Sequence, residues 1–152
     1  MSELQHNASF YGILMLIAGI GIPVMAALNA GLGEKLQSPA LAATILLFVG
    51  MIIAIAYMLI FEGIPKSLYR ATTPLYFYFG GLFVVFYVLS ITWVAPRFGI
   101  GNAVSFVLLG QLISMVTIDQ FGLMGSPQTV ISLQRIIGLA FMAIGVFLVV
   151  RR

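Results

Sequence analysis

Five apolar segments, each long enough to cross a bilayer as a helix, dominate this sequence of 152 residues. Short connections separate the segments, which run over Phe10–Leu28, Pro39–Ile60, Leu75–Val94, Gly101–Ile118 and Ile131–Val150. About 20 apolar residues in a helix span the hydrocarbon core, whereas the strands of a membrane barrel are about 10 residues long and alternate in polarity. The sequence therefore predicts an all-α integral membrane protein with five transmembrane helices, forming a single domain over residues 1–152.

The composition excludes several classes of function. Hydrophobic residues make up 62% of the chain and charged residues 7%, with a mean hydropathy of +1.16, so no separate soluble domain is expected. The net charge of +3 comes from scattered residues and forms no basic patch, which argues against nucleic acid as a partner. Because the chain has no cysteine and no catalytic or nucleotide-binding motif, we expect neither an enzyme nor a bound cofactor or metal.

Several residues mark the helix ends and the packing faces. Asn29 and the glycines that follow it predict the end of the first helix, and Ser38 before Pro39 predicts a capped start for the second. Small residues let membrane helices approach closely. The seven-residue spacing of Gly12, Gly19 and Ala26 therefore predicts close helix contacts along one side of the first helix.

The positive charges are almost evenly divided between the two membrane faces. One face holds Lys66, Arg70 and Arg135, and the other holds Lys35, Arg97, Arg151 and Arg152. An excess of Lys and Arg in short cytoplasmic loops normally sets the orientation of a membrane protein. A three-to-four division gives almost no bias, and it predicts a chain that inserts in both orientations.

Polar side chains within the spans are the candidate solute-binding groups, because they are costly in a membrane unless they face a cavity or a partner. Gln111 lies near the middle of the fourth span with Ser114 one turn on, and the third span has Tyr87 and Ser90. Gln111 either lines a cavity or hydrogen-bonds between helices, and the tyrosine is either lining or packed. Asp119, at a helix end, is interpreted as solvated or paired with an arginine in preference to carrying protons.

The chain resembles the YdcZ-like family of the drug/metabolite transporter (DMT) superfamily over nearly its whole length. The matching residues are Pro23-Val-Met-Ala-Ala-Leu-Asn29-Ala-x-Leu-Gly33, Ser38-Pro39-Ala-Leu-Ala, Gly80-Gly81-Leu-Phe-Val-Val-Phe-Tyr-Val, Gly110-Gln111-Leu, Asp119-Gln-Phe-Gly122-Leu-Met-Gly125 and Arg135-x-x-Gly138-x6-Gly145-Val. The chain departs from the family pattern at Met25, where a glutamine is frequent, and at Tyr76 or Tyr78, where a tryptophan is usual.

This resemblance implies half of an inverted-repeat, ten-helix transporter in the inner (plasma) membrane of a bacterium. It implies an antiparallel homodimer that moves an unknown small solute by alternating access, in agreement with the charge division. Helices three and four would line the solute site, and Asn29 and Asp119 would lie at the cavity mouths or fix helix ends. Two alternatives stay open, a non-transporting scaffold or regulatory subunit and one half of an obligate heterodimeric transporter.

Overall fold

The computed structural model describes residues 2–65, 67 and 73–150, and within these residues it contains helices and connections but no strand. Five helices in this part of the chain are long and apolar enough to cross a membrane, which confirms the predicted fold class. They are α1 (Ser2–Lys35), α2 (Pro39–Tyr57, continued by a π-helical turn at Met58–Glu62), α3 (Gly80–Phe98, preceded by a 3-10 helix at Leu75–Phe79), α4 (Ile100–Phe121) and α5 (Leu133–Val150).

The first helix is longer than the apolar segment from which it was predicted. The segment ends at Leu28, whereas α1 continues through Asn29 and the following glycines to Lys35. Glycine weakens an isolated helix, but it also permits close packing, and Gly33 is buried against neighbouring helices. The second helix starts as predicted, with the Ser38 hydroxyl accepting a hydrogen bond from the Leu41 amide at 3.2 Å and Pro39 in the first turn.

The turn between α3 and α4 is very short. A single residue, Gly99, separates the end of α3 at Phe98 from the start of α4 at Ile100. Gly99 has a φ of 87°, a conformation that glycine adopts without the steric cost of a Cβ. Its amide donates to the Ala95 carbonyl at 2.9 Å, and its carbonyl accepts from the Ala103 amide at 3.0 Å. The two helices are therefore joined directly and pack against each other.

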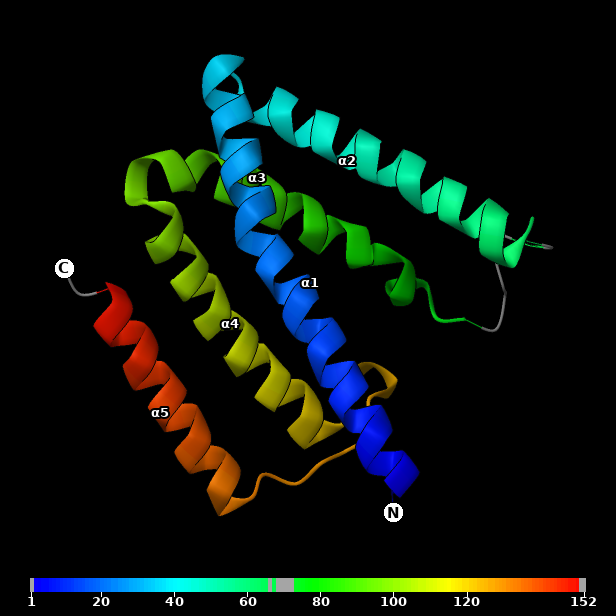
Figure 1. Ribbon diagram of the computed structural model, residues 1–152, viewed down its shortest axis with the longest axis vertical. Helices are drawn as coiled ribbons and strands as arrows, with labels where there is room; N and C mark the ends of the chain where they lie inside the picture. Colours follow the sequence, from blue (N-terminus) through cyan, green and yellow to red (C-terminus); the bar gives the residue numbers. More distant parts are fainter. Residues whose placement is uncertain (1, 66, 68–72, 151–152) are drawn as a thin grey trace.

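The helices converge at one end of the molecule and diverge toward the other. In Figure 1, α2 extends to the right from the α1–α2 turn and α3 extends to the right from where it crosses α1, whereas α1, α4 and α5 extend downward. Helix α1 packs against α2, α3 and α4, while α5 packs against α4. We call the region where the first four helices meet, residues 26–43 and 88–103, the packed end.

Buried residues are concentrated at the packed end and most are small. They include the alanines Ala26, Ala30, Ala42, Ala43, Ala95 and Ala103. Of the three small residues predicted to form close helix contacts along α1, only Ala26 does so, because it is fully buried. Gly12 and Gly19 have open space where a Cβ would stand. Many large apolar side chains are exposed on every long helix, as expected of surfaces that face lipid.

Four of the seven positive residues cannot be assigned to a membrane face from this structure. Lys66, Arg70, Arg151 and Arg152 lie outside the described residues. The even division of positive charge between the two faces therefore stays a prediction from the sequence.

Candidate functional site

A buried hydrogen bond joins α1 to α3 at the packed end. The side-chain amide of Asn29 donates to the Thr92 hydroxyl at 2.5 Å, and this hydroxyl donates to the Val88 carbonyl at 2.6 Å. The two side chains are only 3% and 1% exposed. A hydrogen bond that satisfies polar groups within a membrane stabilises the contact of the helices that provide them. Asn29 thus lies inside α1 at a helix interface, and not at the helix end where the sequence placed it.

Close backbone approach accompanies this hydrogen bond. A Cβ added to Gly33 would stand 3.1 Å from the Thr92 methyl carbon and 3.4 Å from Pro39 Cα. A distance of 3.1 Å is tighter than ordinary carbon–carbon contact, which is about 3.5–4.0 Å. Glycine is therefore needed at this position for α1 to lie against α3 and the start of α2.

Two of the predicted lining residues face a common cavity between α3 and α4. Tyr87 and Ser90 border a cavity of about 180 Å³ whose other walls include Ile91, Ala103 and Phe106. The Tyr87 hydroxyl is buried and has no hydrogen-bond partner within the described part of the chain. Leaving a buried hydroxyl unpaired is costly, so this group is available to a polar ligand or a second protein chain.

The other two predicted lining residues lie farther along α4, outside this cavity. Gln111 and Ser114 are exposed, and neither side chain forms a hydrogen bond with another described residue. Ser114 lies seven residues after Val107 and eleven after Ala103, so it shares with them the helix face that α3 covers at the packed end. The single chain thus brings Tyr87 and Ser90 together but leaves Gln111 and Ser114 uncovered.

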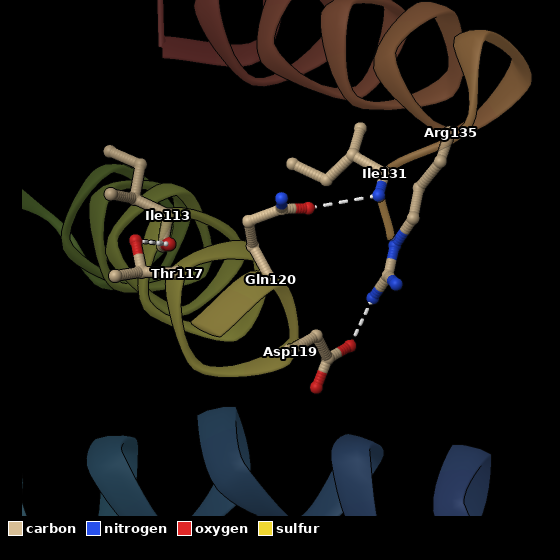
Figure 2. A network of polar contacts seen from close by, with 6 residues as sticks. All are labelled: Ile113, Thr117, Asp119, Gln120, Ile131 and Arg135. Carbon is tan, nitrogen blue, oxygen red and sulfur yellow. Dashed lines mark hydrogen bonds and ion pairs between the residues drawn. The ribbon is translucent and has the colours of Figure 1, made fainter. Parts of the chain in front are cut away.

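A network of polar contacts, shown in Figure 2, joins the end of α4 to the start of α5. Arg135 forms an ion pair with Asp119, and the Gln120 side chain accepts a hydrogen bond from the Ile131 amide at 2.9 Å. Gln128 donates from its side chain to the Gln120 carbonyl at 3.0 Å. We call these five residues the α4–α5 network. The pairing of Asp119 with an arginine agrees with its interpretation from the sequence.

Sequence reasoning missed two residues that position the candidate site. Thr92 was not singled out, although a hydroxyl within the apolar segment Leu75–Val94 was a signal that could have drawn attention to it. Gly33 was assigned to a connection, although it continues the seven-residue spacing of Gly19 and Ala26. Within the described residues, no group of three histidines or carboxylates is arranged to hold a metal ion.

The five long apolar helices and their exposed apolar surfaces define a multi-pass α-helical membrane protein. A family model described as "Putative inner membrane exporter, YdcZ" matches residues 10–148, and the chain belongs to this family. It is therefore an inner membrane protein of an exporter family, a class of protein distinct from enzymes. No curated protein and no solved structure matches the chain.

Proposed function

We propose that the chain is a secondary transporter of a small solute that works as an antiparallel homodimer by alternating access. Two copies in opposite orientations would supply the inverted repeat on which many secondary transporters are built, with the solute bound near the bilayer midplane between them. This proposal combines the membership of an exporter family with the nearly equal division of positive charge in the sequence.

The observation that supports the proposal most strongly is the set of unpaired polar groups at membrane depth. The buried Tyr87 hydroxyl has no partner within the described residues, and Gln111 and Ser114 are exposed on α4. Water is scarce at this depth, so polar side chains there face a cavity, a solute or another protein surface. A second copy that covers α4 would enclose these groups together with Ser90.

The other two candidate residues have a different part in this proposal. Asn29 is engaged with Thr92, and Asp119 is engaged with Arg135, so both hold helices in place. Both contacts join residues that lie on different helices, α1 to α3 and α4 to α5. We therefore assign solute binding to Tyr87, Ser90, Gln111 and Ser114, and helix positioning to Asn29 and Asp119.

Cysteine crosslinking tests the antiparallel arrangement, since the natural chain has no cysteine. Phe98→Cys marks the α3–α4 turn and Leu123→Cys marks the residues just beyond α4, at the opposite end of that helix. When the two single-cysteine chains are mixed in one membrane, we expect crosslinks between Phe98→Cys of one copy and Leu123→Cys of the other. Crosslinks restricted to identical positions would indicate a parallel dimer and would overturn the proposal.

Reconstitution tests the transport function separately. A thermal-stability screen of small solutes on the purified chain identifies a ligand, and uptake of that ligand is then measured in liposomes that contain this chain alone. Ligand-dependent uptake by the homodimer supports transport. Activity that needs a co-expressed second protein would instead indicate a subunit of a heterodimer or a scaffold.

A further inference from the structure

A cavity of about 350 Å³ lies at the packed end, where the α1–α2 turn meets the end of α3. Its lining differs from that of the cavity beside Tyr87, because it contains side chains of opposite charge together with an amide: Glu34, Arg97 and Gln37. Thr92 and Gly33 form part of its wall. The cavity lies at the ends of membrane-spanning helices, which is the level of the lipid headgroups.

The turn that holds Gln37 has an unfavourable backbone conformation. Gln37 has a φ of 51°, in the left-handed region where glycine is usual. The turn is otherwise regular: the Ser38 amide donates to the Gly33 carbonyl at 3.0 Å, and the Gln37 amide donates to the Glu34 carbonyl at 3.1 Å. This is the hydrogen-bond pattern of a helix end at which glycine is preferred. A glutamine here accepts backbone strain and places an amide side chain at the cavity, and such strain is often found at binding sites.

Arg97 is held in a defined position on the opposite wall. Its guanidinium donates a hydrogen bond to the Trp93 carbonyl at 2.5 Å, and its central carbon lies 4.6 Å from the centre of the Trp93 ring. Only one of its five N–H donors is used in this hydrogen bond. Neither Arg97 nor Glu34 forms an ion pair with another described residue, although both line the same cavity. The cavity therefore presents a separated cation and anion.

We propose that this cavity binds a phosphoethanolamine group, with Glu34 facing its ammonium and Arg97 facing its phosphate. A planar guanidinium that is already oriented suits the oxygens of a phosphate, and a carboxylate complements an ammonium. Gln37 adds a hydrogen-bonding amide to the lining of the same cavity. The volume lies in the range of sites for small molecules. The same chemistry occurs in the headgroup of phosphatidylethanolamine and in free glycerophosphoethanolamine, and this inference does not depend on transport.

The single tryptophan of the chain provides a direct measurement of binding, because Trp93 stacks on Arg97. The full-length protein is titrated with glycerophosphoethanolamine in an uncharged detergent, and it is also placed in nanodiscs made with phosphatidylethanolamine, phosphatidylcholine or phosphatidylglycerol. We expect a saturable change in Trp93 fluorescence with the ethanolamine compounds, and at least tenfold weaker responses with ethanolamine or inorganic phosphate alone. A response to the soluble compound identifies a solute site, and a response only in phosphatidylethanolamine nanodiscs identifies a lipid site.

Three variants test whether the charges of Glu34 and Arg97 account for the binding of the phosphoethanolamine group. We expect Glu34→Gln and Arg97→Gln each to weaken binding at least tenfold, whereas Lys35→Gln, next to Glu34 but not in the cavity lining, should bind as the natural chain does. Circular dichroism and unfolding without ligand confirm that each variant is folded. Equal binding by all variants, an equal response to phosphatidylglycerol, or no saturable response to any probe would overturn the proposal.

Discussion

The packed end and the α4–α5 pair are held together by different kinds of contact. At the packed end, α1, α2 and α3 share buried alanines and the hydrogen bond between Asn29 and Thr92. Helix α5, in contrast, has no buried residue over Leu133–Val150. Polar contacts at its start attach it to α4, and the ion-paired side chains of Asp119 and Arg135 are 26% and 27% exposed.

This difference indicates where the molecule is rigid and where it can move. Close packing of small residues in a membrane gives many van der Waals contacts that all have to be lost together. A partly exposed ion pair contributes little, because water and salt screen it. We therefore expect the packed end to be the most stable part of the chain, and α5 to separate from α4 more easily. The predictions below test this comparison, beginning with the largest effect.

The largest loss of stability is expected from Gly33→Val. Its Cβ would stand 3.1 Å from the Thr92 methyl carbon, and the branched side chain adds further overlap. Overpacking of this kind costs about 2–3 kcal/mol of unfolding free energy. Unfolding in detergent, followed by circular dichroism, measures the loss. Gly31→Val is the matched control, since a Cβ at Gly31 meets nothing within 4 Å. Equal losses in both variants would show that helix propensity, and not packing, accounts for the effect.

Thr92→Val is expected to lower the free energy of unfolding by about 1–2 kcal/mol, because it leaves the buried Asn29 amide without its partner. The same unfolding measurement applies. Thr117→Val is the control, because the Thr117 hydroxyl is exposed and donates only to the Ile113 carbonyl of its own helix. Combining Thr92→Val with Asn29→Leu should cost less than the sum of the two single changes. Strict additivity would mean that the two side chains do not stabilise each other.

Gln111→Leu should separate binding from folding, because Gln111 lies on α4 beyond the packed end and is exposed. If the proposed homodimer binds its solute at this residue, the variant should remain folded and its affinity for that solute should fall about tenfold, which corresponds to about 1.4 kcal/mol. Thermal stability and solute affinity are measured together. Asn102→Leu is the control near the start of the helix, where Asn102 donates to the Phe98 carbonyl. Unchanged affinity in a well-folded Gln111→Leu dimer would assign this residue to helix packing.

The smallest change in overall stability, below about 1 kcal/mol, is expected from Arg135→Gln, because the ion pair with Asp119 is partly exposed. The effect of Arg135→Gln on local stability at the start of α5 should be larger than its effect on overall stability. Hydrogen exchange at the start of α5 is expected to accelerate, and Asp119→Asn should have the same effect. Gln134→Ala, an exposed neighbour on the same helix, should leave exchange unchanged. If neither Arg135→Gln nor Asp119→Asn alters exchange, the ion pair does not hold α5 in place.

The sequence predicted the five membrane-spanning helices, because apolar length and the cap at Ser38 are local signals. It predicted the family through its matching residue motifs. It did not predict how far α1 extends. Asn29, Gly31 and Gly33 are typical of a helix end when only their own helix is considered. The burial of Asn29 and Gly33 depends on α2 and α3, which approach from elsewhere in the chain.

The candidate site was predictable only in part, for a similar reason. Spacing on α3 correctly indicated that Tyr87 and Ser90 face the same way, and they share a cavity. Spacing on α4 could not show that α3 diverges before it reaches Gln111 and Ser114. The hydroxyl of Thr92 was a local signal, but its partner Asn29 lies 63 residues away in the chain, and no local pattern reveals which residue it contacts.

The single-residue turn at Gly99 also limits how the molecule can change shape. Helices α3 and α4 cannot slide apart at this turn, so we expect their relative motion to be a rotation about it. Helix α4 has 22 residues and is therefore about 33 Å long. A rotation of about 10° about Gly99 would move the far end of α4 by about 6 Å. A small change of backbone angle at one glycine is thus amplified into a large displacement at the opposite membrane surface.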